Sequence, residues 1–243
     1  MDYKAYLFDF DYTLANSEKG IVMCFQHVFE RNGFKGIEED AIKKTIGLTL
    51  EEAFMLLTGI KDRETVAGYR KQYVEKSDEV MVANTKLFPE ALPMLRKLKK
   101  QGVKTGIIST KYRYRIESTI RLYGMDELID LVIGGEDVKT AKPSPEGVWK
   151  ALDRLKCGRE ETLYIGDSLV DARTAENSGV HFAAVTTGTT TAADFETVPH
   201  VNVMKNLSEL VKCKMLWSVT RVTPVGQACL VDWFVAQDRE AAL

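Results

Sequence analysis

Short apolar runs alternate with segments of helical spacing along most of the chain, and this order predicts the fold. Residues 5–8, Ala-Tyr-Leu-Phe, form an apolar run as long as a buried strand. From residue 89 onward, strand-like runs and helical segments follow each other in turn. Such alternation predicts an α/β fold with a parallel sheet covered by helices on both faces. The expected strands are 5–8, 103–108, 131–133, 162–165 and 181–185, and the expected helices are 90–101, 113–123, 145–156 and 171–178.

The segment 17–82 interrupts this alternation, because all of it has helical spacing. Ser17 is the expected N-cap of its first helix, Thr49 and Glu52 have the spacing of a capping box, and Asp62 is expected to cap a longer helix. A block of helices placed after the first strand predicts a small domain inserted into the core. The predicted parts are a core at 1–16 and 85–212, an all-helical domain at 17–84, and a C-terminal extension at 213–243 whose role the sequence does not indicate.

Charge and cysteine content narrow the classes of partner and compartment. The chain carries 33 basic and 35 acidic residues, a net charge of −2 and no basic block, so we expect no nucleic-acid partner. No apolar run approaches the roughly 20 residues needed to cross a bilayer. Met1 is followed by Asp2 and Lys4 and not by a signal-peptide core, and the four cysteines lie far apart. We therefore expect a cytoplasmic protein with free thiols and no membrane partner.

Polar residues stand near the carboxyl ends of four expected strands, where sheets of this kind bind ligands. Four carboxylates gathered at one edge would repel each other unless a cation joined them, and oxygen ligands without His or Cys suit Mg²⁺. Each pattern alone is more often a turn or a helix cap, so the interpretation depends on their order and placement together. The residues are Asp9, Asp11, Ser109, Thr110, Lys142, Asp167 and Asp171.

With the motifs DFDYT, IIST, AKP and GDSLVD in this order, the chain resembles the haloacid dehalogenase superfamily over residues 4–212. It is similar in particular to phosphatases of the phosphoglycolate phosphatase and β-phosphoglucomutase type. The resemblance implies a Rossmann-like parallel-sheet core with an inserted all-helical cap domain. It also implies a Mg²⁺-dependent phosphatase that hydrolyses a small phosphorylated metabolite through an aspartyl-phosphate intermediate.

The same resemblance implies a role for each catalytic residue. Asp9 would be the nucleophile that attacks phosphorus, and Asp11 would protonate the leaving oxygen and later deprotonate the attacking water. Ser109 would donate a hydrogen bond to a phosphoryl oxygen, with Thr110 beside it in the substrate site. Lys142 would neutralise the charge of the phosphoryl group and of Asp9.

The metal site is also implied by the resemblance. Mg²⁺ would be held by Asp9, Asp167 and the backbone carbonyl of Asp11, with Asp171 in support through water. The alternation of a strand would send Asp9 and Asp11 to the same side, as this chemistry requires.

The residues that would contact the rest of the substrate are less clearly indicated. Gly47 and Thr49 lie where relatives place a loop that touches the substrate, and the alternative is an ordinary turn with Thr49 as N-cap. Lys111, Arg113 and Arg115 follow the second motif. They could steer an anionic substrate, or they could be solvated at a helix start.

Tyr12 stands where the family's first motif has a glycine. A bulky residue is costly at positive φ, so we expect an ordinary backbone conformation at this position. The chemistry of the motif is expected to be unaffected.

Several functions stay open at this point. A sugar phosphomutase or a pyrophosphatase would use the same motifs. A dehalogenase would share the fold, but the family's dehalogenases lack the second carboxylate of the first motif, which is present here as Asp11. A receiver domain phosphorylated on aspartate would be only about 120 residues long and would have no helical insert. The sequence does not indicate which ester is used, and we expect a monomer, with a dimer as the alternative.

Overall fold

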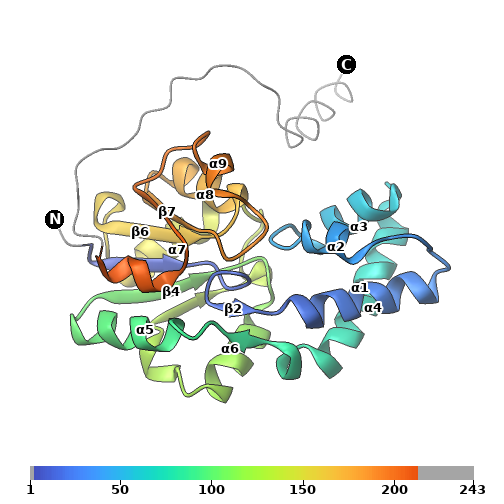
Figure 1. Cartoon of the computed structure of the whole chain (residues 1–243), viewed down its shortest axis with the longest axis horizontal. Helices are drawn as coiled ribbons and strands as arrows, with labels where there is room; N and C mark the ends of the chain where they lie inside the picture. The colour runs from blue at the N-terminus through green and yellow to red at the C-terminus, as the bar shows by residue number, and fades with distance from the viewer. Residues whose placement is uncertain (1–2, 213–243) are drawn as a thin grey trace.

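The central sheet has six parallel strands, and one of its two central strands is the first in the chain (Figure 1). In this computed structural model, which describes residues 3–212, the strand order is β5-β4-β1-β6-β7-β8. Phe8, the last residue of β1, lies opposite Ile107 of β4 and Ile165 of β6, so three adjacent strands end together. The strands are β1 Ala5–Phe8, β4 Lys104–Ile108, β5 Leu131–Ile133, β6 Thr162–Gly166, β7 His181–Val185 and β8 Asn202–Met204.

Helices cover both faces of the sheet, which confirms the predicted α/β fold. Successive strand residues point to opposite faces, so Phe8 belongs to one hydrophobic cluster and its neighbour Leu7 to the other. The Phe8 face is covered by α5 Ala91–Lys100, α6 Arg113–Leu122 and η5 Leu207–Lys212, and the Leu7 face by α7 Glu146–Leu155, α8 Leu169–Ser178 and α9 Ala192–Phe195. Three short 3-10 turns complete this part, namely η2 Asp126–Leu128, η3 Gly135–Asp137 and η4 Arg159–Glu161.

The helices inserted after β1 pack around a hydrophobic cluster of their own. The ring of Phe25 lies at its centre, with ring centroids 4.8 Å from Phe54 and 5.0 Å from Tyr73. Figure 1 shows these helices together at one end of the molecule, beyond the carboxyl ends of the strands. They are α1 Glu18–Arg31, α2 Glu39–Lys43, α3 Leu50–Thr58, α4 Arg63–Val80 and the 3-10 turn η1 Val82–Asn84.

Two of the three predicted caps of these helices are confirmed. Thr49 and Glu52 form a capping box at α3, and the Asp62 side chain accepts a hydrogen bond from the backbone N of Thr65 at 2.8 Å. Ser17 stands at the N-cap of α1, but its hydroxyl makes no capping hydrogen bond. It is instead the partner of Thr85 Oγ1, at 3.1 Å, across the two segments that join the helices to the core.

Those two joining segments pair with each other. β2 Ala15–Asn16 and β3 Lys86–Leu87 form a two-stranded antiparallel sheet, which the sequence pattern did not predict because each strand has only two residues. The predicted extension 213–243 lies outside the described residues. Among the described helices, none has the length and apolar character that a bilayer crossing needs.

Candidate active site

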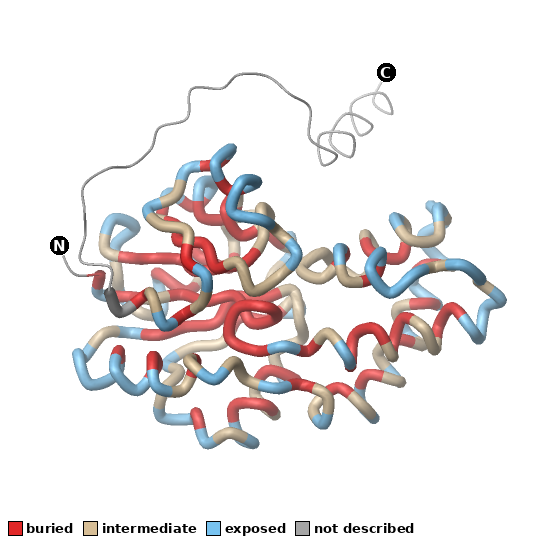
Figure 2. The backbone as a smooth tube through the Cα atoms, viewed as in Figure 1, coloured by how far each residue is buried: buried red, intermediate tan, exposed pale blue. Residues whose placement is uncertain are grey.

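The first motif lies in a buried turn directly after β1. The backbone N of Asp9 donates to the carbonyl of Ile165 in β6 at 2.9 Å, which continues the sheet by one residue. Figure 2 shows this part of the chain as buried, and Asp9 itself is only 2% exposed. Two residues later, Asp11 turns toward the inserted helices and lines the cavity beneath them.

The expectation of an ordinary backbone at Tyr12 is wrong, because its φ is 58°, in the left-handed region. A residue other than glycine in this conformation costs about 1–3 kcal/mol. The local contacts offset this cost: the Tyr12 backbone N donates to the carbonyl of Ala15 at 2.7 Å, and its hydroxyl donates to Glu18 Oε2 at 2.6 Å. The motif therefore keeps the turn that glycine allows, although a large aromatic residue occupies it.

Three buried carboxylates, those of Asp9, Asp167 and Asp171, come together at the ends of β1 and β6, each offering an oxygen within 4.8 Å of the others. Lys142 Nζ lies 2.9 Å from Asp9 Oδ1 and 2.6 Å from Asp171 Oδ1. The Asp9 contact is an ion pair whose groups are not aligned for a hydrogen bond. Burial raises the pKa of Asp9 to about 6 against the opposing charge of Lys142. Burial likewise raises the pKa of Asp167 well above its usual value, and the neighbouring carboxylates add to the effect.

The three carboxylates differ in how fully their oxygens are bonded. Asp171 Oδ1 accepts from Lys142 Nζ and from the Tyr164 hydroxyl at 3.1 Å, and its Oδ2 accepts from Ser168 Oγ at 2.6 Å. Asp167 accepts a hydrogen bond only at Oδ1, from Thr13 Oγ1 at 3.2 Å, among the described residues. Lone pairs thus remain on Asp9 and Asp167, whereas Asp171 is already occupied by protein groups.

The charge balance of the site fits a divalent cation. Asp11 makes its own ion pair, with both carboxylate oxygens 2.9–3.0 Å from Lys111 Nζ. Four carboxylates therefore face two ammonium groups, those of Lys111 and Lys142, so two negative charges are left without a partner when all four carboxylates are ionised. Burying uncompensated charge is strongly unfavourable, and hard oxygen ligands suit Mg²⁺. The donor set thus fits a divalent metal held mainly by the carboxylates with free lone pairs.

Ser109 and Thr110 follow β4 and lie beside this cluster. The backbone N of Ser109 donates to the carbonyl of Ile133 at 3.0 Å, and its Oγ accepts from the backbone N of Lys111 at 3.3 Å. Thr110 Oγ1 donates to the carbonyl of Gly47 at 3.3 Å. A core residue predicted for the substrate site thus touches the loop of the inserted helices that was predicted for the same site.

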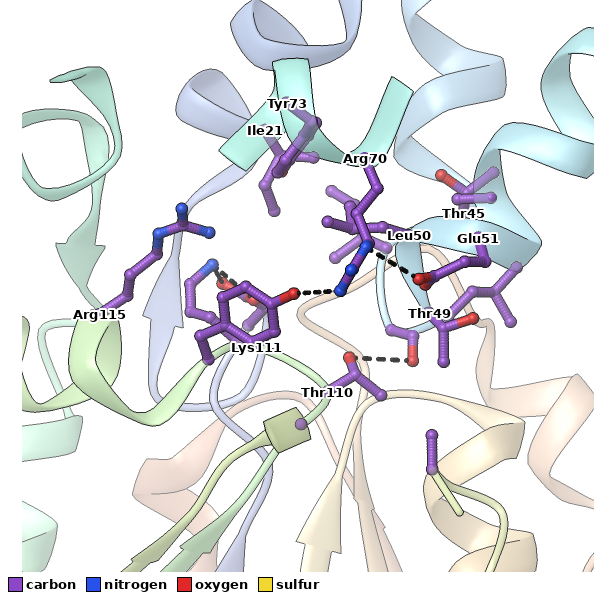
Figure 3. A pocket seen from close by; sticks show the side chains of 18 of the residues that line it. Ile21, Thr45, Thr49, Leu50, Glu51, Arg70, Tyr73, Thr110, Lys111 and Arg115 are labelled. Carbon is purple, nitrogen blue, oxygen red and sulfur yellow. Dashed lines mark hydrogen bonds and ion pairs between the residues drawn. The ribbon is translucent and has the colours of Figure 1, made fainter. Parts of the chain in front are cut away.

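A cavity of about 320 Å³ lies between the core and the inserted helices (Figure 3). Asp11, Thr110, Gly47 and Thr49 line it, so these predicted residues meet at one place. In Figure 3 Arg70 reaches into the same space from α4. Its Nε lies 3.1 Å from Glu51 Oε1 and its Nη1 donates to the Tyr112 hydroxyl at 2.7 Å.

Arg115 connects α6 of the core to α4 of the insert. Its Nη2 lies 2.8 Å from Asp78 Oδ1 and donates to the carbonyl of Val74 at 3.0 Å. The Tyr114 hydroxyl donates to the same Asp78 oxygen at 2.6 Å. Arg115 is only 6% exposed, so it is not a solvated residue at a helix start.

Sequence reasoning left several groups of the site without a role. Lys111 was considered only as a steering or solvated residue, yet it is ion-paired with Asp11. Tyr164 lies in an apolar strand, and the sequence pattern does not indicate that its hydroxyl contacts Asp171. Thr13 could have been found, because it belongs to the DFDYT motif itself.

The chain matches a family model and several named proteins over most of its length. Residues 6–185 match the family model of the haloacid dehalogenase-like hydrolases. The pyrophosphatase PpaX of Bacillus cereus is 33% identical over 179 residues, which are 74% of this chain and 81% of that protein. PpaX of Halalkalibacterium halodurans is 34% identical over 187 residues, 76% of this chain and 84% of that protein.

Solved structures with a similar fold also cover most of this chain. A chain from Bacteroides fragilis described as a haloacid dehalogenase-like hydrolase is 54% identical, with a TM-score of 0.85, and the match covers 86% of this chain and 100% of that one. A chain from Lactobacillus plantarum described as a phosphoglycolate phosphatase is 24% identical, with a TM-score of 0.78, over 87% of this chain and 99% of that one. The second likeness concerns the fold alone.

Proposed function

Because the chain belongs to the haloacid dehalogenase-like hydrolases and is an enzyme of the phosphatase type, we propose that it is a Mg²⁺-dependent hydrolase of a small phosphorylated metabolite. The reaction would run through a phosphoryl group carried on Asp9. The observation that supports this most is the buried group of Asp9, Asp167 and Asp171 around Lys142, next to a cavity lined by Asp11.

In the first step an oxygen of Asp9 attacks phosphorus, and the bond from phosphorus to the leaving oxygen breaks. Asp11 donates its proton to that leaving oxygen, which departs as an alcohol or an acid. In the second step a water gives a proton to Asp11 and attacks the phosphorus of the aspartyl phosphate. The bond from Asp9 to phosphorus breaks, and inorganic phosphate leaves with Asp9 and Asp11 restored.

The remaining residues would stabilise charge and fix positions, which is most of what phosphoryl transfer needs. Lys142 would offset the charge of Asp9 and of the phosphoryl oxygens, and the Ser109 hydroxyl would donate to one of those oxygens. Mg²⁺ would be held by Asp9, Asp167 and the carbonyl of Asp11, with Asp171 behind them. When bound, it would supply positive charge to the developing negative charge on the phosphoryl group.

Among the described residues, four basic side chains line the cavity, those of Arg70, Lys111, Arg115 and Lys139. Three of them are ion-paired, Arg70 with Glu51, Lys111 with Asp11 and Arg115 with Asp78, so Lys139 is the lining cation without an ion pair in the described part of the chain. An unpaired cation at the cavity favours a leaving group that is itself negatively charged. Phosphoglycolate and pyrophosphate both have an anionic leaving group, and the PpaX relatives of this chain are named pyrophosphatases.

We further propose that the helices of 17–84 act as a cap over the core at 1–16 and 85–212. The paired strands β2 and β3 are suitable hinges, since each link is short and both leave the core at one point. No nucleic-acid or membrane partner belongs to this proposal, and a cytoplasmic monomer remains our expectation. A phosphomutase is the second candidate, because its first step would be the same.

The test is release of inorganic phosphate from a generic aryl phosphate with and without Mg²⁺. We expect turnover with Mg²⁺ and none after chelation. A panel of phosphorylated metabolites with neutral and anionic leaving groups then identifies the substrate class. Retention of phosphate on the protein without turnover would contradict the hydrolase, and isomerisation of a sugar phosphate without net phosphate release would favour the mutase.

A further inference from the structure

The loop after β7 lies directly against a candidate metal ligand. A Cβ atom placed on Gly188 would stand 2.0 Å from Asp167 Oδ2 and 2.9 Å from its Cγ. Real Cβ contacts are essentially never closer than 3.0 Å. Gly188 does not have a positive φ, so the backbone does not require glycine there. Space for the Asp167 carboxylate is what requires it.

The opposite oxygen of Asp167 is held by the turn after β1. Thr13 Oγ1 donates to Asp167 Oδ1 at 3.2 Å. The carboxylate thus lies between two loops, one after β1 and one after β7, on either side of the strand that carries it. Neither Thr13 nor Gly188 offers a carboxylate to a metal.

The two loops are also fastened to each other. Thr187 Oγ1, next to Gly188, donates a short hydrogen bond to the carbonyl of Tyr12, next to Thr13. Tyr12 lies four residues beyond the end of β1, and in the described part of the chain no backbone N–H outside regular helices and strands donates to its carbonyl. The position of Gly188 against Asp167 is therefore coupled to the turn that holds Asp11 and Thr13.

We propose that Gly188 and Thr187 are positioning residues that fix the Asp167 carboxylate and thereby set the affinity of the site for divalent cations. The inference rests on the proposed function, because it takes Asp167 as a metal ligand. It assigns a role to the segment TTGTT, which lies outside the four sequence motifs. Residues that orient metal ligands change metal affinity by about 10–100-fold when they are mutated.

The test measures Mn²⁺ binding to the full chain by electron paramagnetic resonance, without substrate. Gly188→Ala should weaken Mn²⁺ binding at least about 10-fold, since the new methyl group displaces the carboxylate. Thr187→Val, which keeps the shape and removes the donor, should weaken it in the same direction by less. Thr189→Ala, a change at the exposed neighbour, should bind Mn²⁺ as the wild type does.

A double substitution separates an effect on Asp167 from general damage to the loop. Asp167→Ala removes the two closest atoms and keeps the Asp167 Cβ, which would lie 3.2 Å from the new methyl group. We expect Gly188→Ala to lower the thermal unfolding midpoint of the metal-free protein in the wild-type background, and to lower it by much less in the Asp167→Ala background. If the midpoint falls equally in both backgrounds, Gly188 does not act through Asp167.

The other possible results for these variants and for the wild type also support or overturn the proposal. Wild-type affinity in both Gly188→Ala and Thr187→Val would overturn the proposal. If Gly188→Ala does not fold, the result for Thr187→Val decides alone. A wild-type protein that binds Mn²⁺ but releases no phosphate from an aryl phosphate would refute the proposed function and leave the positioning role intact, whereas a wild type that binds no Mn²⁺ would refute both.

Discussion

Removing the carboxylate of Asp78 should shift the cap away from the core. Asp78 Oδ1 accepts from Arg115 Nη2 at 2.8 Å, from Arg115 Nε at 3.3 Å and from the Tyr114 hydroxyl at 2.6 Å. After Asp78→Ala, the buried Arg115 guanidinium keeps the carbonyl of Val74 and two aromatic ring faces, but no carboxylate. All of these lost contacts join α4 of the inserted helices to α6 of the core. Their loss should therefore weaken the closed arrangement of the cap on the core.

The structure bounds the size of this effect. A hydrogen bond to a charged group contributes about 1.5–3 kcal/mol. The Asp78 side chain is 52% exposed, so solvent screening reduces the loss to about 1–2 kcal/mol. That corresponds to a change of about 5–30-fold in the ratio of closed to open forms. kcat/KM falls by up to the same factor once the open form predominates.

The assay combines kcat/KM for a phosphorylated substrate with the distance between spin labels on the cap and the core. Glu79→Ala is the matched control, because exposed Glu79 lies on the same helix and, among the described residues, is ion-paired only with Lys76 of that helix. We expect longer cap–core distances and lower kcat/KM in Asp78→Ala alone. If the two variants have the same distances and the same kcat/KM, Arg115 and Asp78 do not control closure.

Four further predictions concern the chemistry and the cap. Asp9→Asn should abolish turnover and leave the unfolding midpoint near the wild-type value, as measured by phosphate release and thermal melting; turnover near the wild-type rate would remove Asp9 from its role. Asp167→Ala should raise the Mg²⁺ concentration needed for half-maximal activity by at least about 10-fold, because a direct anionic ligand is lost, and an unchanged requirement would contradict the site. Ca²⁺ should inhibit in competition with Mg²⁺, since its larger and looser coordination misplaces the attacking oxygen, and activation by Ca²⁺ would contradict the mechanism. Exchange of residues 17–82 for the cap of a relative with another substrate should transfer the preference in kcat/KM while aryl phosphate hydrolysis persists; if the preference stays with the core, the cap does not select the substrate.

The core of the fold could be predicted because its strands are buried on both faces. Such strands have no polar face, so they stand out as apolar runs, and those at 5–8 and 181–185 agree with the structure residue for residue. β8 was missed because it has only three residues, and one of them is the polar Asn202. β2 and β3 were missed because a two-residue pairing has no periodicity to detect.

The meeting of the candidate site residues could be predicted because their positions follow from topology. Strand ends in a parallel sheet meet at one edge, so motifs after β1, β4 and β6 had to come together. The cavity could not be predicted in the same way, because its partners come from segments far apart in the sequence. Arg115 shows the difference, since its burial depends on Asp78 and Val74 of a helix whose approach no local pattern encodes.

The backbone at Tyr12 has a left-handed conformation that residues other than glycine disfavour, and the neighbouring groups of the site account for it. Three backbone N–H groups, those of Thr13, Leu14 and Ala15, donate to the single carbonyl of Phe10, at 3.3, 3.0 and 3.0 Å. This tight arrangement sets where Asp11 and Thr13 point, and it leaves Tyr12 with a φ of 58°. The conformation is therefore determined by the groups on either side of Tyr12, and a tyrosine is tolerated because its buried ring and its bond to Glu18 offset the strain. The prediction from residue type was wrong because the side chain of Tyr12 does not determine its φ. The positions of Asp11 and Thr13 determine the backbone between them, and Tyr12 adopts the φ that this backbone needs.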